Sequence, residues 1–431
     1  MIQLAKKEQC TGCSACYSIC PVHCISMRED SEGFLYPAID EGKCSKCGEC
    51  EKICPVICRG NERKPLHVYA AKNPNEEIRR QSSSGGIFTL IAEAIIQKGG
   101  VVFGARFNEK WEVTHDYTET IEGLAAFRGS KYVQSNIGDT YAAAEKFLKA
   151  GKEVLFSGTP CQIAGLKAFL QKDYDNLLTV DLVCHGVPSP LVWKRYLDEF
   201  IGEIVPPPTP KNNIVNIAFR DKVNGWNTLT FVIYLIMETK DITNIKFCDK
   251  RYGWNKRTLV LESSMPDAKT KKVSFIETAD KNPYMKGFLQ NLYLRPSCYE
   301  CPCRSFKSGS DITIADYWGI QNYYPEFDDN KGVSLVMVNS EKGKRIYELL
   351  HKTDQETSYN EALAGNFNIE KSVRLPVKRA LFFEKMADTE SIILLINKLT
   401  APSLKNKIKR IIAALLRRLG LLSLVKSILR K

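Results

Sequence analysis

The apolar residues of this 431-residue chain follow helical and strand periodicities in turn after residue 65. Phe88 to Gln97 is an apolar-rich helix ended by Gly99-Gly100, and VVFGARF (residues 101–107) is the strand that follows it. Strand–loop–helix alternation is typical of a mainly parallel sheet with its chemistry on loops at the strand ends. We therefore expect an α/β fold with a mixed, mainly parallel sheet. The same succession continues through a helix at 140–149, a strand at 153–156, a helix at 162–171 and a strand at 177–183.

Other segments have a strand pattern. Residues 214–276 look strand-rich, with a turn at Asn224-Gly225, and the Pro-rich loop 206–210 bounds a predicted insertion. Near the amino terminus, ISMREDSEGFLYPAID (25–40) predicts two short strands about a Ser-Glu-Gly turn. Later in the chain, GVSLVMVN (332–339) and EKGKRIYELLHK (341–352) predict a strand followed by a helix.

The last 31 residues, 401–431, have the pattern of a basic amphipathic helix. Its length and the Arg417-Arg418 pair argue against a membrane span, so we expect it to lie on an anionic membrane surface. Docking on a partner protein or on the chain's own core is the alternative. The apolar positions are Leu404, Ile408, Ile411, Ile412, Leu415, Leu416, Leu419 and Leu422, and the basic positions opposite them include Lys405 and Lys409.

The distribution of charge and the first ten residues limit the functions and the cellular locations that we expect. The net charge is +12, but nine basic residues and no acid lie in 401–431, which leaves the rest near +3. A general nucleic-acid surface is therefore not indicated. The first ten residues, MIQLAKKEQC, contain no apolar signal-peptide core. The high cysteine content of the chain suits a reducing compartment. We expect a cytoplasmic protein, held peripherally at the inner face of the membrane.

Sixteen cysteines are present, and eight of them form the same twelve-residue pattern twice, CTGCSACYSICP (10–21) and CSKCGECEKICP (44–55). This C-x2-C-x2-C-x3-C-P spacing is typical of two-cluster 4Fe-4S ferredoxins, in which the fourth cysteine binds the other cluster. Structural zinc usually takes two widely separated CxxC pairs, and a disulfide framework does not suit a long chain without an export signal. The predicted ligand sets are Cys10, Cys13, Cys16 and Cys54 for one cluster, and Cys44, Cys47, Cys50 and Cys20 for the other.

Each copy also has one further cysteine four residues after its last ligand, Cys24 and Cys58. Because cysteine behaves as a compact apolar residue, we expect both to be small buried side chains beneath the clusters. Residues 1–62 are thus predicted to form an α+β two-cluster ferredoxin-like domain.

Three further features are candidates for chemistry. SSSGG (82–86) precedes a helix, where it could cap the helix or approach a phosphate. Cys161 follows Pro160 at a helix start and could be a metal ligand, a nucleophile or a core residue. Cys161, Cys184, Cys298 and Cys301 could together hold a third cluster, although zinc or plain burial stays possible. His185 could donate protons, or it could be a structural histidine bonded to a backbone carbonyl.

Several motifs occur in a fixed order between residues 65 and 390, and together they resemble one family. The ordered set is similar to the beta-subunit family of hydrogenases and dehydrogenases that act on the deazaflavin coenzyme F-420; a chlorophyll-cycle reductase belongs to the same broad family. The motifs are SSSGG, RGSKYVQS (128–135), GTPCQIAGL (158–166), DLVCHGVPSP (181–190), FRDKVNGW (219–226), LRPSCYEC (294–301) and SDITIADYWG (310–319).

The resemblance implies an FAD-binding domain over residues 65–395, with a ferredoxin-like donor feeding the amino-terminal clusters. Cys161, Cys184, Cys298 and Cys301 would hold a flavin-proximal cluster; Cys303 lies outside the family pattern, so the choice between CxxC and C-x-C ligands stays open. Residues 316–319 would form a structural turn behind the site. His185 and Lys131 are the candidate catalytic residues, Lys131 placing a charge against flavin or phosphate. The implied FAD contacts are Ser83, Ser84, Gly85, Gly86, Ser130, Lys131 and Tyr132, with Thr159, Pro160 and His185 nearby.

The leading hypothesis is an iron–sulfur flavoprotein oxidoreductase. It would pass electrons from a ferredoxin-like donor through 4Fe-4S clusters and FAD to an unidentified acceptor, for which a deazaflavin coenzyme is a candidate. One alternative is a non-catalytic electron-transfer subunit of a larger redox complex. Another is an interaction or assembly protein that uses zinc.

Overall fold

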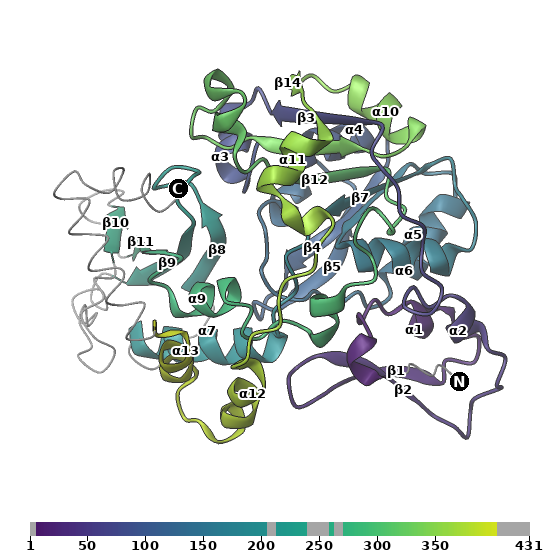
Figure 1. The fold of residues 1–431 in the computed structure, drawn as a ribbon, viewed down its shortest axis with the longest axis horizontal. Helices are drawn as coiled ribbons and strands as arrows, with labels where there is room; N and C mark the ends of the chain where they lie inside the picture. The colour runs from purple at the N-terminus through teal and green to yellow at the C-terminus, as the bar shows by residue number, and fades with distance from the viewer. Residues whose placement is uncertain (1–5, 205–212, 239–257, 263–269, 403–431) are drawn as a thin grey trace, which may run out of the picture.

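A computed structural model describes residues 6–204, 213–238, 258–262 and 270–402, which form three sheets (Figure 1). The predicted basic helix at 401–431 lies outside these described residues except for its first two positions, and so does the Pro-rich loop at 206–210. None of the described helices is long and apolar enough to cross a membrane.

The largest sheet is mixed, and its parallel part is at the centre. Its strand order is β14-β3-β13-β12-β7-β6-β4-β5. The four central strands β12, β7, β6 and β4 pair in parallel, whereas the flanking pairs are antiparallel. The predicted mixed α/β class is confirmed. The strands are β3 (His67–Lys72), β4 (Val101–Phe107), β5 (Val113–Thr118), β6 (Val154–Gly158), β7 (Leu177–Leu182), β12 (Ile312–Asp316), β13 (Ser334–Val338) and β14 (Thr353–Glu356).

Helices cover both faces of this sheet, because neighbouring strand residues point to opposite sides. Val101 and Phe103 pack with α5 (Thr140–Lys149) and α6 (Pro160–Leu170), whereas Val102 packs with α4 (Ile87–Ile96). The helices and strands predicted from 88 to 183 are therefore confirmed within a few residues. Other helices near this sheet are α3 (Glu76–Gln81), α10 (Glu341–Glu348) and α11 (Tyr359–Gly365).

A second sheet has four antiparallel strands in the order β10-β11-β9-β8. Its apolar face shares a core with α7, α9, α12 and α13. The predicted strand-rich character of 214–276 is thus confirmed for the described part of that segment. The elements are α7 (Pro190–Ile204), β8 (Ile214–Asp221), β9 (Thr230–Glu238), β10 (Thr258–Glu262), β11 (Thr270–Thr278), α9 (Pro283–Leu289), α12 (Arg379–Asp388) and α13 (Ile392–Thr400).

The amino-terminal unit has short helices α1 (Ala15–Ile19) and α2 (Glu49–Lys52) and the hairpin β1 (Ile25–Glu29) and β2 (Leu35–Ile39). It is docked firmly on the larger domain, beside α5 and α6 (Figure 1). Cys13, Ala15 and Ile53 belong to the same apolar core as those two helices. The hairpin turn also lies tightly against α7, since a Cβ on Gly33 would come within 2.2 Å of the Leu191 Cβ.

Candidate metal and cofactor centres

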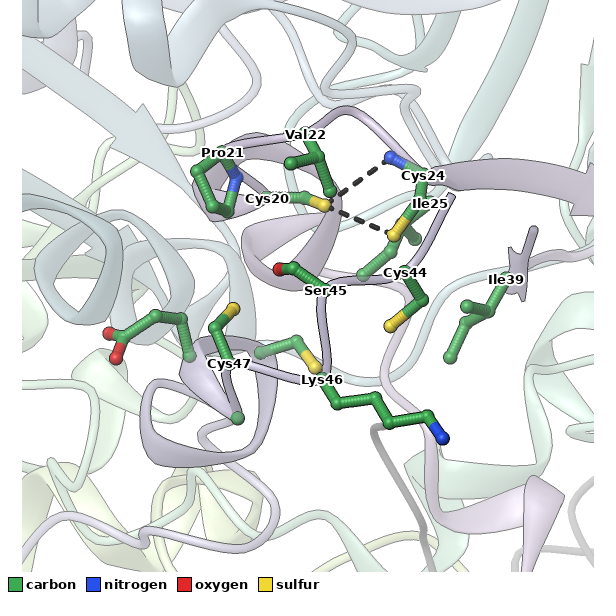
Figure 2. Close-up of a pocket in the computed structure, with 13 residues that line it drawn as sticks. Cys20, Pro21, Val22, Cys24, Ile25, Ile39, Cys44, Ser45, Lys46 and Cys47 are labelled. Atoms are coloured by element: carbon green, nitrogen blue, oxygen red, sulfur yellow. Dashed lines mark hydrogen bonds between the residues drawn. The ribbon is translucent and has the colours of Figure 1, made fainter. Parts of the chain in front are cut away.

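The predicted ligand set Cys44, Cys47, Cys50 and Cys20 lines a hollow of about 350 Å³, called here the outer hollow. Cys20 ends α1, Cys44 and Cys47 come from the loop that leads into α2, and Cys50 lies in α2 itself. Figure 2 shows this loop around the hollow. Cys47 is exposed, while Cys20 is buried. The structure thus brings this set together close to the surface.

The other predicted set lines a hollow of about 330 Å³, called here the inner hollow. The chain turns around it with two left-handed residues, Gly12 at φ +68° and Ser14 at φ +63°. Three of the four cysteines are buried. As the spacing predicts, the fourth cysteine of each motif crosses to the other hollow. The lining cysteines are Cys10, Cys13, Cys16 and Cys54.

A third hollow, of about 390 Å³, is lined by Cys161, Cys184, Cys298 and Cys301. Cys161 lies in the first turn of α6, Cys184 follows β7, and the other two belong to the segment around the 3-10 helix Pro296–Glu300. Thr11 lines both this hollow and the inner one, so the two are neighbours. Three hollows of similar volume each therefore have four cysteines in their walls.

Cys303 does not line the third hollow. It is buried next to Cys301, and its hydrogen bond is the main cause that lowers the pKa of Cys301 to about 6. Of the two alternatives left by the sequence, this geometry favours the CxxC pair Cys298 and Cys301 over the C-x-C pair as the wall of the hollow.

Some of the buried cysteines are difficult to ionise without a bound cation. Burial, followed by repulsion from neighbouring thiolates, raises the pKa of Cys16 and of Cys161 to about 12. Bound iron would favour the thiolates, because a cation reverses this effect. Backbone amides also donate to sulfur, from Gly12 to Cys10 (3.4 Å) and from Val187 to Cys298 (3.4 Å). Such bonds are typical of iron–sulfur sites, so the residues present fit the clusters.

The two extra cysteines differ in their surroundings. Cys24 is buried beside Cys20, as predicted. The same prediction for Cys58 is wrong, because Cys58 is exposed and its sulfur lies 3.8 Å from the Glu51 carbonyl. The two cysteines have the same spacing but differ in burial. The hairpin strand β1 begins directly after Cys24, whereas the chain after Cys58 does not continue into a hairpin strand.

A buried arginine connects the amino-terminal unit to the wall of the third hollow, and no sequence motif pointed to it. Arg295 is fully buried and donates to the carbonyl oxygens of Cys10 (2.7 Å) and Leu35 (2.9 Å) and to the Gln134 amide oxygen (3.0 Å). Its own carbonyl accepts from the Cys298 amide. A guanidinium stays charged and is costly to bury unless negative charge lies near. Anionic clusters in the two adjacent hollows would supply that charge.

A second buried arginine, Arg304, belongs to the wall of the third hollow. Its guanidinium donates to the carbonyl oxygens of Cys184, His185 and Asn368. It therefore fixes the loop that follows β7 and places a positive charge beside the cysteines.

The residues expected to contact FAD are only partly brought together. The Ser130 amide donates to the Ser83 hydroxyl (2.7 Å), so the two segments meet. However, the Ser84 hydroxyl donates to the Val333 carbonyl, and the Gly85 amide donates to the Ser334 hydroxyl. Gly86, at φ +82°, is the residue before α4. None of the three hollows is lined by Ser83, Ser84, Gly85, Gly86, Ser130, Lys131 or Tyr132.

Buried basic groups lie beside these residues. Arg220, which is almost fully buried, forms an ion pair with Asp316 (3.2 Å), yet its three nitrogens have no hydrogen-bond partner among the described residues. Burial lowers the pKa of Lys131 and of Lys222 to about 7. The unpartnered nitrogens of Arg220 fit an anionic group such as a phosphate, whereas the Lys222 ammonium already donates to the carbonyl oxygens of Arg79 (2.6 Å) and Ser84 (2.5 Å).

The candidate catalytic residues are held by the protein itself. The Lys131 ammonium donates to the carbonyl oxygens of Ala126 and Arg128, both at 2.9 Å. His185 contacts Asn291 through Nε2 (2.6 Å) and Asn368 through Nδ1 (3.3 Å). These contacts occupy both ring nitrogens of His185 with side-chain amides, which favours a structural role, although not the backbone contact considered above. Thr159 caps α6, and Pro160 lines the third hollow.

Comparison with known protein families agrees with this geometry. A family model described as a 4Fe-4S dicluster domain matches residues 9–58. This part of the chain is thus an iron–sulfur electron-transfer module. Two models for the coenzyme F420 hydrogenase/dehydrogenase beta subunit match further along the chain, the N-terminal model at 68–140 and the C-terminal model at 151–205 and 223–360. The chain belongs to the coenzyme F420 hydrogenase/dehydrogenase beta-subunit family.

Among solved structures, the chain is similar to the one described as the xenon derivatization of the F420-reducing NiFe hydrogenase complex from Methanosarcina barkeri. Identity is 15%, the TM-score is 0.41, and the match covers 76% of this chain and 94% of that chain. A search of curated proteins gives no match.

Proposed function

We propose that this protein is an FAD-dependent iron–sulfur oxidoreductase. Electrons from a ferredoxin-like donor enter at the outer hollow and pass by way of the inner and third hollows toward FAD. The acceptor beyond FAD is unidentified, and a deazaflavin coenzyme is the candidate that the family suggests. The observation that carries the proposal is the row of three similar hollows, each with four cysteines, in which Thr11 borders both the inner and the third.

The chemistry divides between the cofactors and the chain. Cubane clusters supply one-electron transfer and a flavin supplies the exchange between single electrons and pairs. The chain's residues hold these groups at fixed positions: Cys47 keeps the outer site open to a partner, and the buried Cys13 and Cys16 keep water from the inner one. Arg295 and Arg304 add positive charge between the inner and third sites, which favours the arrival of an electron.

The flavin part of the proposal has separate support. Ser83 and Ser130 meet, and the unpartnered nitrogens of Arg220 lie near Tyr132, where they affect the pKa of its phenol. We propose that Arg220 and Lys222 hold the phosphates of FAD. Lys131 would then add a charge at the same site.

The test is anaerobic purification with iron, sulfide and flavin measured on one sample. Three cubanes and one flavin require about twelve irons and one FAD per chain. Cys161→Ala should lower iron by about four per chain and leave the ferredoxin-like unit intact. About eight irons in the wild-type protein would remove the third cluster from the account, and absence of flavin would remove the oxidoreductase.

A second candidate is a non-catalytic electron-transfer subunit. The internal bonds of Ser84 and Gly85 favour it, because those groups are not free to bind a ligand. Purified protein that reduces no small acceptor alone, but gains activity when a redox partner is added, would select this candidate.

Peripheral attachment to an anionic membrane is proposed from the sequence of residues 401–431 alone. Deletion of 403–431 should release the protein from sedimented membranes. Unchanged co-sedimentation would remove this part of the proposal.

A further inference from the structure

Cys24 is a fifth thiol at the outer hollow, and the ferredoxin spacing gives it no role. Its side chain is only 5% exposed and lines the hollow together with the four predicted ligands. Its sulfur is 3.4 Å from the Cys20 sulfur, as Figure 2 shows. The Cys24 amide donates to the Cys20 sulfur at 3.3 Å.

The backbone around Cys24 fixes this position. His23 has a left-handed conformation, at φ +49°, and its amide donates to the Cys20 carbonyl (3.1 Å). This turn brings Cys24 back over Cys20. The Cys24 carbonyl then accepts from the Asp40 amide (2.8 Å), where β1 and β2 begin to pair. The thiol is therefore held at the hollow by the hairpin rather than by a flexible loop.

Cys58 occupies the equivalent position in the second motif and provides an internal control. Its amide donates to the Cys54 carbonyl (2.8 Å), but its side chain is exposed and lies against the Glu51 carbonyl. It does not line the inner hollow. The same spacing therefore places a fifth thiol at the outer site and none at the inner one.

We propose that Cys24 is a reserve ligand of the outer cluster. With Cys20 bound to iron and so without its proton, the Cys24 thiol donates an S–H hydrogen bond to it. When Cys20 is lost, the Cys24 sulfur bonds to the vacated iron and its proton passes to solvent. No electron is transferred in this exchange of one thiolate for another. The inference needs the outer cluster alone, and neither FAD nor the third cluster enters it.

The exchange is tested by iron and sulfide content after anaerobic purification. Cys20→Ala should keep the outer cluster, with iron per chain equal to the wild type. Cys20→Ala combined with Cys24→Ala should lose about four irons per chain. The matched comparison is made at the inner site. There, Cys54→Ala should lose about four irons per chain both alone and in combination with Cys58→Ala. Equal losses in Cys20→Ala and in the double variant would overturn the reserve role.

A second measurement keeps all eight ligands in place and so does not depend on how the ligand variants fold. Reduction potentials are followed by electron paramagnetic resonance in Cys24→Ala and Cys58→Ala. Loss of a hydrogen bond to a cluster sulfur lowers the potential, so Cys24→Ala should lower that of the outer cluster. Cys58→Ala should leave the inner potential unchanged. An unshifted outer potential in Cys24→Ala would overturn the hydrogen bond from Cys24.

Discussion

The two halves of the amino-terminal unit have the same cysteine spacing but different surroundings. At the inner hollow, Cys13 is part of the core shared with α5 and α6, and Arg295 is bonded to the Cys10 carbonyl. At the outer hollow, Cys47 is exposed and a fifth thiol is present. The spacing determines which cysteines meet, while the surroundings determine whether a site faces a partner or the interior. On this basis we assign the outer site to electron entry and the inner site to transfer onward.

The largest expected difference is in stability. Cys13→Ala removes a ligand and opens the shared core, where Cys13 packs so closely on α6 that a Cβ added to Gly165 would lie 2.9 Å from the Cys13 Cβ. Because metal binding contributes to folding, we expect it to reduce the free energy of unfolding by about 3 kcal/mol more than Cys47→Ala. Urea unfolding under argon measures this. Equal destabilisation by the two variants would show that the inner site is no more integral than the outer one.

The outer and inner clusters should lose their iron at different rates. With a chelator and a mild oxidant, the outer cluster should be lost first, since Cys47 is open to solvent and Cys13, Cys16 and Cys54 are buried. Iron release should then show an early phase of about four irons per chain. Cys47→Ala should lack that phase. A single phase that releases all the iron together would contradict the difference in access.

Of the two amino-terminal sites, Arg295→Met should act on the inner one alone. It leaves the carbonyl oxygens of Cys10 and Leu35 without a donor, at a cost of about 1–3 kcal/mol for each buried group. Loss of the positive charge should also lower the reduction potential of the inner cluster relative to the outer one. Arg295→Lys, which keeps the charge, is the control. Parallel shifts of both potentials would contradict a role specific to the inner site.

The smallest effect is expected at the hairpin. Glu32 forms a two-oxygen ion pair with Arg379 of α12, which ties the hairpin to the larger domain. Glu32→Gln should reduce the free energy of unfolding by about 1 kcal/mol, and by less at high salt. Glu29→Gln, on the exposed face of the same hairpin, should change nothing measurable. A salt-independent effect would indicate lost packing instead.

The sequence predicted the features that depend on local spacing. The ligand sets of the two amino-terminal hollows and the succession from α4 to β7 follow from short-range patterns, which fold the same way in many contexts. The third set could be named from the cysteines only as one alternative beside zinc or plain burial, because its members come from three separate segments, and the family resemblance then implied the same set. The place of β3 and β13 in the sheet could not be predicted, because they pair with strands that are far away in the sequence and a local pattern does not specify such a partner.

Burial of particular side chains was the part that could not be predicted. Cys24 and Cys58 have the same spacing, and only the structure distinguishes the buried one from the exposed one. Arg295 and Arg220 look like ordinary surface arginines in the sequence, since arginine is rarely buried. Their roles depend on neighbours far away in the sequence, such as Cys10 for Arg295 and Asp316 for Arg220.

The path through the third hollow is tested most directly by rapid mixing of reduced ferredoxin with Cys161→Ala and wild-type protein, followed by absorbance of iron–sulfur and flavin bands. We predict that the variant's amino-terminal clusters are reduced as fast as in the wild type, while its flavin is reduced much more slowly. Flavin reduction at the wild-type rate in this variant would show that electrons reach the flavin by another route.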